Sequence, residues 1–453
     1  MNKKIFAIAI LGCLLLTTVA GLSATGLNVE NKNDRNKYPT YNPTPEMWSK
    51  TFGTEDLVEQ GQDVEITNDG GYIIIGDGDH GYESLDDIWL LKLDSKGNKI
   101  WDKKIGTDEE EYGHSIEVAS DGGFLIAGSI WSKNNDSRVY AWLIKTDSNG
   151  DIEWEKIFGP MFWTNIHQPW YKDFYVENTD DGGCVIYGLK DDRAWMAKVD
   201  FQGDVVFDKT YDASYFEIAH SVKQTDDNGF IMVGYTSRGS GANTVSQIVL
   251  KKLDSNGEVV FNKIFEPLTE YEYDRGYCIE TANDGGYVII GESLTYSDYT
   301  YIIFKTDSDG NIEWKKNLGL FAEIETYGDG SIQKTSDGGF IVTGIILSIG
   351  GNPSDLWIAK YKINGELDWQ KRYDDGKREV DCGNSIKQTN DGGYIITGYT
   401  VIWRTHYPLI TYSDIWVIKT DSKGNIKSRT RNMNQFLQNI LEHFPLLQQL
   451  LKL

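Results

Sequence analysis

The hydrophobic residues of this chain occur in short runs that begin and end at turns rich in glycine and aspartate. One such run, "TNDGGYIIIG" at positions 67–76, returns as "TNDGGYIITG" at 389–398. In each copy an Asp-Gly dipeptide, which readily adopts the positive φ angles of a tight hairpin, precedes a tyrosine and three apolar or β-branched residues. Such runs, bounded by turn residues, predict strands rather than helices.

The same turn recurs along the chain at intervals of 46 to 60 residues. A second signature follows each turn, "WLLKLDSKGNKIW" in its first copy, and its lysine also recurs seven times. Every unit has the same two landmarks in the same order, which indicates a repeat architecture. The turn aspartates are Asp69, Asp121, Asp181, Asp227, Asp284, Asp337 and Asp391. The shared lysines are Lys92, Lys145, Lys198, Lys252, Lys305, Lys360 and Lys419.

The second repeat illustrates how each unit divides into four strands. A first strand at 113–119 ends at Asp-Gly, "GGFLIAG" is the second, "AWLIKTD" is the third, and "DSNGD" turns into the fourth, "IEWEKIFG". Four short antiparallel strands repeated at this period are typical of a propeller blade. The sequence therefore predicts an all-β protein, a seven-bladed β-propeller of four-stranded antiparallel blades.

The two ends of the chain indicate how the ring closes. In six repeats an aromatic residue lies four positions after the glycine of the second turn, whereas the seventh repeat has Ser428 there. The N-terminal segment "MWSKTFG", around Trp48, supplies the missing strand. We expect this strand to complete the last blade, so that no sheet edge is left open. The six aromatic residues are Trp101, Trp154, Phe207, Phe261, Trp314 and Trp369.

The alternation of strand direction predicts where a ligand binds. Links between strands one and two and between strands three and four carry the repeated turns on one face, so the irregular links fall on the other. Variable loops on a rigid scaffold usually carry binding. Ten of the 14 tryptophans occupy repeated positions and are expected to pack between blades. The predicted ligand-binding residues in the irregular links are Trp131, Trp163, Trp170, Tyr171, Trp403 and Tyr407.

Five acidic residues share one repeat position, where the chain begins the innermost strand of a blade. We expect them to surround the mouth of a central channel, where like charges repel unless they are solvated, protonated or bridged by a cation. Solvated turn acids, a polar or sugar ligand, and calcium or another hard cation all remain open. The acidic ring consists of Glu59 and, as candidate cation ligands, Glu111, Glu217, Asp274 and Asp381.

Composition narrows the choice of partner. The net charge of −24 argues against a nucleic acid, because phosphate binding needs a basic surface. Beyond Cys13, three cysteines remain at wide spacing without a Cys-x-x-Cys pair, which argues against a zinc site or a disulfide framework. No cofactor is expected beyond the calcium alternative. The shared third-strand lysine is expected to be structural, paired with turn carboxylates such as Asp94 or Asp147.

The ends of the chain differ from the repeats. Residues 1–24 are interpreted as a secretory signal peptide, with lipidation at Cys13 or an uncleaved anchor as the alternatives. Residues 25–45 indicate a polar linker, and the repeats occupy 46–431. Residues 432–453 predict an amphipathic helix that either docks on the propeller or serves in sorting or peripheral membrane attachment. We therefore expect an extracellular or cell-surface protein.

The span 46–424, with units of the form "DGGYIIxGxT…DxWxxKxDxxGNxxW", resembles uncharacterised secreted repeat proteins of archaea and bacteria. The second turn is similar to that of quinoprotein-type and Asp-box-type propellers, which also lies between strands three and four. This resemblance implies a secreted propeller, and the leucine-rich C-terminus resembles the tails of some secreted archaeal proteins. It implies no particular reaction, because neither a vicinal cysteine pair nor a sialidase arginine triad can be assigned in this sequence.

Three functions remain open. The first, which we favour, is a monomeric binding scaffold that contacts a protein or a glycan at the cell surface through the variable face. The second is a carbohydrate-active enzyme that uses two mouth carboxylates as acid and base, which requires a separation of roughly 5–9.5 Å. The third is a structural component of the cell envelope without a small ligand.

Overall fold

The residues that the computed structural model describes belong to the repeats, and the two ends of the chain are not among them. Residue contacts divide the chain into two units, Met1–Thr44 and Pro45–Leu453, and every described residue belongs to the second. The predictions for the signal peptide, the linker and the C-terminal helix therefore stay predictions. Within the described ranges we find no helix that could span a membrane. The described residues are 47–54, 57–79, 86–132, 138–161, 174–211, 216–238, 245–265, 274–294, 299–319, 322–323, 332–346, 354–374, 380–403 and 411–426.

All regular structure in these ranges is β-strand, in the order that the repeats predict. The first repeat holds β2 (Val58–Ile66), β3 (Tyr72–Asp79), β4 (Asp87–Leu93) and β5 (Lys99–Ile105). The second holds β6 (Glu110–Val118), β7 (Phe124–Trp131), β8 (Val139–Thr146) and β9 (Ile152–Met161). The third holds β10 (Tyr175–Asn178), β11 (Cys184–Lys190), β12 (Arg193–Val199) and β13 (Val205–Tyr211).

The later repeats follow the same plan. The fourth holds β14 (Phe216–Gln224), β15 (Phe230–Arg238), β16 (Val245–Leu253) and β17 (Val259–Ile264). The fifth holds β18 (Asp274–Thr281), β19 (Tyr287–Leu294), β20 (Tyr299–Thr306) and β21 (Ile312–Gly319). The sixth holds β22 (Ala322–Glu323), β23 (Ile332–Lys334), β24 (Phe340–Ile346), β25 (Asp355–Tyr361) and β26 (Leu367–Tyr373). The last holds β27 (Asp381–Gln388), β28 (Tyr394–Trp403), β29 (Thr411–Thr420) and β1 (Trp48–Phe52).

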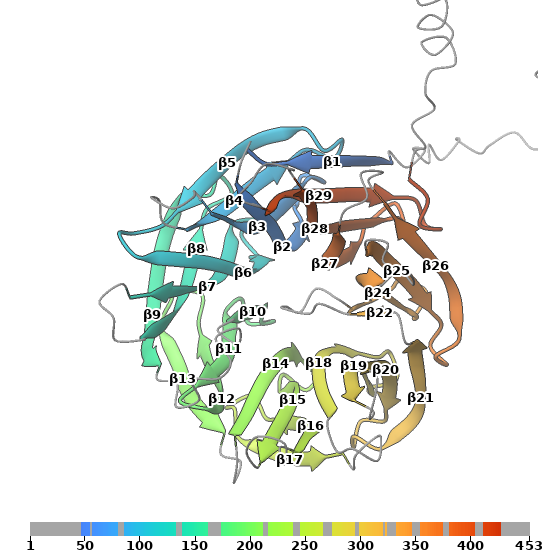
Figure 1. The fold of residues 1–453 in the computed structure, drawn as a ribbon. Helices are drawn as coiled ribbons and strands as arrows, with labels where there is room; N and C mark the ends of the chain where they lie inside the picture. Colours follow the sequence, from blue (N-terminus) through green and yellow to red (C-terminus); the bar gives the residue numbers. More distant parts are fainter. Residues whose placement is uncertain are drawn as a thin grey trace, which may run out of the picture. The chain divides into compact units, whose positions relative to one another are not determined.

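Each repeat forms an antiparallel sheet whose strands lie in chain order. Four sheets have four strands each, and the sixth repeat forms a fifth sheet in which β22 and β23 both pair with β24. The first and last repeats are joined into one sheet through a single parallel pairing, Val58 with Ser413. The sheets surround a common centre, with β2, β6, β14 and β18 innermost and β5, β9, β13, β17, β21 and β26 at the rim (Figure 1). This is the arrangement of a β-propeller.

The burial of each strand follows from its place in the sheet. In β4 every residue after Asp87 is buried, because the neighbouring sheets cover both faces. In β5, at the rim, exposed and half-buried residues alternate, because one face meets solvent. The core therefore lies between sheets. Trp195, for example, is fully buried and packs edge-on against Phe158 of the preceding repeat and against Phe174, with ring centroids 5.3 and 6.0 Å apart.

An aromatic residue on each fourth strand packs against a turn glycine of the next repeat. Gly97 has φ 73°, and a Cβ there would lie 2.8 Å from the Trp48 ring, so only glycine fits. Trp48 belongs to β1, which pairs antiparallel with β29 from Trp48↔Lys419 to Phe52↔Ile415. This is the pairing predicted for the N-terminal strand. The equivalent neighbours are Trp101 and Gly150, Trp154 and Gly203, Phe207 and Gly257, Phe261 and Gly310, Trp314 and Gly365, and Trp369 and Gly424.

The shared lysine pairs with a turn aspartate, but not with the one predicted. Lys92 is buried and donates to both carboxylate oxygens of Asp69, at 3.0 and 2.9 Å. Asp94 instead accepts hydrogen bonds from two backbone N–H groups of its own turn, and Asp147 does the same. The prediction was wrong because backbone donors already occupy those carboxylates. The equivalent ion pairs are Lys145–Asp121, Lys198–Asp181, Lys252–Asp227, Lys305–Asp284, Lys360–Asp337 and Lys419–Asp391.

Candidate functional site

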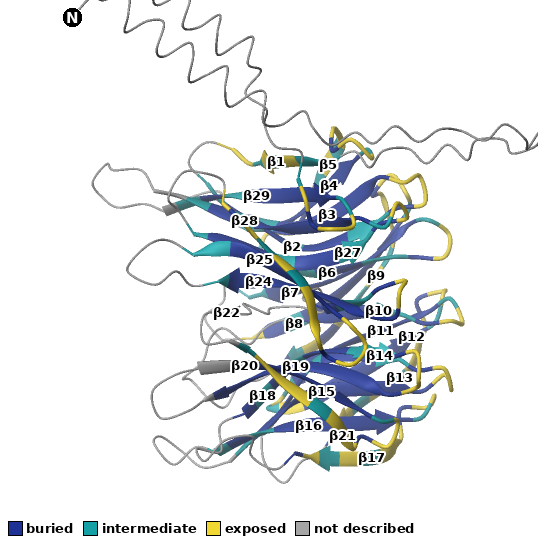
Figure 2. Cartoon of the chain, turned by 90° about the vertical axis from the view of Figure 1, so that its right-hand side faces the viewer, coloured by how far each residue is buried: buried dark blue, intermediate teal, exposed yellow. Residues whose placement is uncertain are grey.

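The two ends of the strands differ in their connections. The Asp-Gly-Gly turns and the turns between third and fourth strands lie together at one end, the turn end, where exposed residues gather (Figure 2). The links between second and third strands, and those between repeats, leave from the opposite end, the loop end. These links vary in length, from the two residues 191–192 to the 13 residues 162–174. The described strands thus place the links between second and third strands and those between repeats at one end, as the sequence predicts.

Two of the six predicted ligand-binding residues lie in described strands. Trp131 is the last residue of β7, and its half-buried ring packs edge-on against Tyr112 with centroids 5.6 Å apart. Trp403 is the last residue of β28. Both strands end at the loop end. The other four, Trp163, Trp170, Tyr171 and Tyr407, lie outside the described residues.

The five predicted acids lie at the start of innermost strands, and their side chains are buried. Each is the first or second residue of its strand. Buried acids must be paired or hydrogen-bonded within the fold, since transferring an unpaired carboxylate from water is strongly unfavourable. The exposed fractions of the whole residues are 3% for Glu59, 0% for Glu111, 2% for Glu217, 1% for Asp274 and 1% for Asp381.

Two of these carboxylates fasten the link that precedes their own strand. Glu59 accepts hydrogen bonds from the N–H and the hydroxyl of Thr54, at 2.7 and 3.0 Å. Glu111 accepts from the N–H of Thr107 at 3.1 Å and also from its hydroxyl. Burial raises the pKa of Glu59, and the two bonds from Thr54 oppose that rise. The carboxylate therefore fixes the crossover from one repeat to the next.

A third acid has a different partner. Glu217 pairs with the ammonium group of Lys251 inside the fourth repeat. In the described part of the chain, no three histidine, cysteine or acidic side chains are grouped so as to hold a metal ion. Calcium binding at these acids remains a prediction.

Farther along the innermost strands, towards the centre of the fourth and fifth repeats, polar and aromatic side chains pack together. His220 stacks on Tyr235 and meets Tyr277 edge-on, with centroids 5.6 and 5.4 Å apart. The Arg275 guanidinium lies 4.9 Å from the centroid of the Tyr235 ring and 3.5 Å from the Glu292 carboxylate. Burial, with a smaller effect of Arg275, lowers the pKa of His220 to about 3, so this histidine is neutral at neutral pH.

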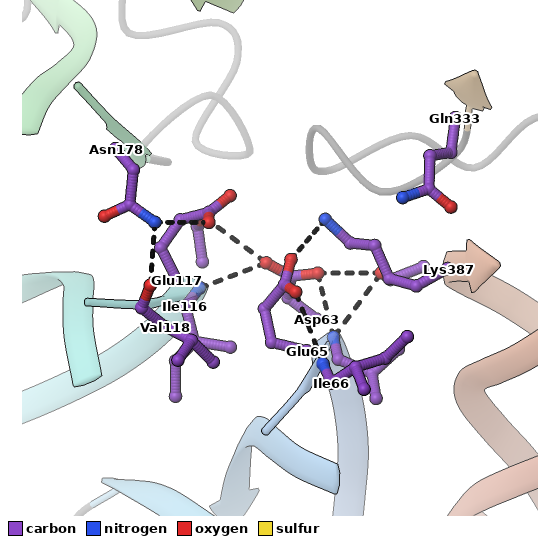
Figure 3. A network of polar contacts seen from close by, with 12 residues as sticks. Asp63, Glu65, Ile66, Ile116, Glu117, Val118, Asn178, Gln333 and Lys387 are labelled. Carbon is purple, nitrogen blue, oxygen red and sulfur yellow. Dashed lines mark hydrogen bonds and ion pairs between the residues drawn. The ribbon is translucent and has the colours of Figure 1, made fainter. Parts of the chain in front are cut away.

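A second charged group, which the sequence analysis missed, lies near the turn end of the innermost strands. We call it the central charge cluster: Glu65, Glu117, Glu177, Lys223 and Lys387. In Figure 3 the side chains of Glu65, Glu117 and Lys387 point toward one another from three separate repeats. Lys387 is ion-paired with Glu65, and Lys223 with Glu177 at 2.6 Å. The pairs link the last repeat to the first and the fourth to the third.

Glu117 has no lysine of its own in this cluster. It accepts a hydrogen bond of 2.9 Å from the Asn178 amide. Burial, followed by the charge of Glu65, raises the pKa of Glu117 well above its ordinary value. Burial would lower the pKa of Lys387, but the charges of Glu65 and Asp63 outweigh it and raise that pKa. The cluster therefore has two ion pairs and a carboxyl group that tends to keep its proton.

A sequence signal for the cluster was present. Its members all stand four residues before the turn aspartate of their repeat, and Glu280 and Gln333 occupy the same position in the remaining two repeats. A charged or amide residue therefore recurs near the end of every first strand. Only the ring arrangement, however, brings these positions from separate repeats together.

Comparisons with known proteins give no family. No family model matches the chain. A stretch of 80 residues is 29% identical to the regulatory protein FlaEY of Caulobacter vibrioides, which covers 15% of this chain and 8% of that protein. The chain thus matches only a small part of that relative's length.

Several solved structures are similar in outline. The polysaccharide lyase Uly1 has a TM-score of 0.47 at 9% identity, covering 80% of this chain and 90% of its own. Sqt1 from Chaetomium thermophilum has 0.44 at 12%, covering 83% and 99%. The GH93 alpha-L-arabinofuranosidase of Fusarium graminearum has 0.43 at 9%, covering 83% and 98%. These scores are too low to carry an argument, and the fold assignment rests on strand order and pairing.

Proposed function

We propose that the seven repeats are the seven blades of a closed β-propeller, and that the protein is a secreted or cell-surface binding scaffold whose ligand contacts the loop end. The blade count is supported by the seven aromatic–glycine neighbours that link successive repeats and by β1, which pairs with β29 of the last repeat while Trp48 packs on Gly97 of the first. The chain acts as a monomer, and the resemblance to secreted repeat proteins accords with this role.

The observation that carries the proposed function is the contrast between the ends of the strands. The turns at one end have the same hydrogen bonds in every repeat, whereas the links at the other end differ in length and sequence. Links that vary on a scaffold of constant structure are well suited to binding a specific ligand. Glu59 and Glu111 are engaged by the backbone and hydroxyl of neighbouring threonines, and this favours a binding role for the loop end over acid–base chemistry at those two carboxylates.

A loop exchange tests the proposal. Trp403 pairs with Thr411, so residues 404–410 can be replaced by the two-residue turn Asn-Gly, which suits a tight hairpin. The fold already contains such a turn, because Lys190 pairs with Arg193 across residues 191–192. We expect the purified protein to bind members of a glycan array or of a panel of cell-surface proteins, and the exchange to weaken that binding at least about tenfold through loss of contacts.

A matched control lies at the other end of the same repeat. Lys423 is exposed in the turn between β29 and the following residues, and Lys423→Glu is expected to leave binding unchanged. Loss of binding in Lys423→Glu together with retention in the loop exchange would refute the proposed location. Hydrolysis of a bound glycan, abolished by Glu111→Gln with Glu217→Gln, would replace the scaffold by the carbohydrate-active alternative.

A further inference from the structure

A cavity lies at the rim between the third and fourth repeats, beside the turn that joins β16 to β17. Its volume is about 400 Å³, within the range of small-molecule sites. Tyr211, Lys251 and Gly257 are buried in its wall, whereas Thr210, Glu258 and Asn262 are exposed around them. The full lining is Lys209, Thr210, Tyr211, Lys251, Gly257, Glu258, Val259 and Asn262.

Lys251 sets this repeat apart from the others. Its side chain is 2% exposed and is ion-paired with Glu217, whose side chain is 3% exposed, and its ammonium lies 5.4 Å from the centroid of the Tyr211 ring. A buried ion pair is often no more stabilising than apolar residues of the same volume, so packing does not explain the lysine. The residues at the equivalent position of the other repeats are Leu91, Ile144, Ala197, Phe304, Ala359 and Ile418.

The buried pair has hydrogen-bonding capacity that the fold does not use. An ammonium group has three donors, and the described contacts of Lys251 provide one carboxylate acceptor and the face of one ring. The second carboxylate oxygen of Glu217, Oε2, is buried without a hydrogen-bond partner. Such unmet groups are unfavourable and are usually satisfied by a polar molecule. Of the two residues, Lys251 lines the cavity, so the pair presents a buried donor to it.

The charges around the cavity cancel. Lys209 donates to the Glu258 carboxylate at 2.6 Å and to the carbonyl of Asn256 at 2.7 Å, just as Lys251 is neutralised by Glu217. In the cavity an anion would meet the Glu258 carboxylate and a cation would meet both ammonium groups, so neither is favoured. A hydroxyl group donates and accepts at once and carries no charge.

We propose that this cavity is a binding site for a small neutral polyhydroxylated molecule, of the size of one sugar ring, held by Lys251 in its wall with Lys209, Glu258 and Asn262 at the opening. None of the lining residues belongs to a link at the loop end, so the site stands or falls independently of the proposed function.

The test is a titration of the purified protein with D-glucose, D-galactose, N-acetyl-D-glucosamine and myo-inositol, followed by calorimetry or NMR. We expect saturable binding of at least one probe with a Kd on the order of 1 mM, as befits a ligand of this size. Lys251→Met combined with Glu217→Gln removes the pair without leaving a buried lone charge and should weaken binding about tenfold. Thermal unfolding checks that this variant is folded.

A second pair of variants keeps the test decisive if the double variant does not fold. Lys209→Met should also weaken binding, whereas Lys263→Met, which removes the equivalent rim lysine of the next repeat, bonded to Asn311 at 2.6 Å, should not. Absence of saturable binding by all four probes overturns the proposal. So does binding that is equal in wild type, Lys209→Met and Lys263→Met, and so does preferential binding of acetate or inorganic phosphate.

Discussion

The Asp-Gly-Gly turns and the innermost strands that lead into them both contain acidic residues. The partners of these acids are the same in every turn but differ among the innermost strands. In the turns, one arrangement recurs: an aspartate accepts from a backbone N–H two residues on and from the lysine of the third strand. In the innermost strands, the first and second repeats each fasten an acid to a threonine, the fourth fastens one to a lysine, and a further acid of the second repeat accepts from an amide. The contacts that repeat therefore form the scaffold of turns, whereas the contacts that differ between repeats lie on the strands around the centre.

The two regions also shift the pKa of a carboxyl group in opposite directions. Burial would raise the pKa of Asp69, but hydrogen bonds from Thr67, Lys92 and the N–H of Gly71 outweigh it and lower that pKa to about 2. Glu117 receives one amide donor and lies near other acids, so its pKa is raised. A turn carboxylate thus stabilises the fold in its charged form, and Glu117 in its neutral form.

The largest effect is expected at Asp63, a single aspartate where other repeats have residues such as Ser115 and Ser385. It accepts from the Ser385 hydroxyl at 2.7 Å and from the N–H of Ile116 at 3.0 Å, so it joins three repeats. Asp63→Ala should lower the free energy of unfolding by about 3 kcal/mol, because several buried donors lose their acceptor. Chemical denaturation measures this value. A loss below about 1 kcal/mol would show that the innermost strands do not depend on this individual residue.

An intermediate effect distinguishes two kinds of turn glycine. Gly70 and Gly97 have φ of 78° and 73°, but a Cβ at Gly70 would meet nothing within 4 Å, whereas at Gly97 it would lie against Trp48. Gly70→Ala should cost about 1 kcal/mol from backbone strain. Gly97→Ala should cost about 1–3 kcal/mol more, from overpacking between repeats. Equal losses in thermal or chemical unfolding would contradict the inter-repeat role of Trp48.

The smallest effect is expected at Glu117 and concerns pH. Its folded pKa lies above the ordinary value of 4.5, so its contribution is fully present below that pH and is lost as pH rises through the folded pKa. Glu117→Gln keeps a neutral group of similar shape, so the stability of the variant should depend less on pH above 4.5. We expect the substitution to change the free energy of unfolding by no more than about 1 kcal/mol. Denaturation midpoints at pH 5 and pH 8 measure this difference. A steeper pH dependence in the variant would show that Glu117 is charged in the fold.

The turns and the strand boundaries could be predicted from the sequence, because they depend on residues close together in the chain. An Asp-Gly-Gly turn is set by residues within a few positions of one another, so its seven copies mark strand boundaries without knowledge of distant contacts. The aromatic residue on each fourth strand and the N-terminal segment around Trp48 likewise follow from counting repeat positions. The strand order, the β1–β29 pairing and the location of irregular links at one end were predicted in this way.

Contacts between residues that are distant along the chain could not be predicted from the sequence. Lys92 was expected to meet Asp94, two residues away, but it meets Asp69, because the fold places the two turns side by side and the Asp94 carboxylate is already satisfied. The acids at Glu59 and Glu111 share a repeat position that the sequence shows plainly. Their burial was not visible, since it depends on how closely one sheet covers the next.

The sequence by itself determined the repeating unit, the succession of strands and the end of the sheets at which variation lies, because these depend on local turn chemistry and on alternation along the chain. Only the tertiary structure decided which charges meet. Glu65 and Lys387 come together across 322 positions because their sheets surround a common centre. Glu217 and Lys251 come together across 34 positions because β14 and β16 lie in one sheet. That geometry sets the burial of these groups and the pKa of Glu117, and it leaves the cavity beside Lys251.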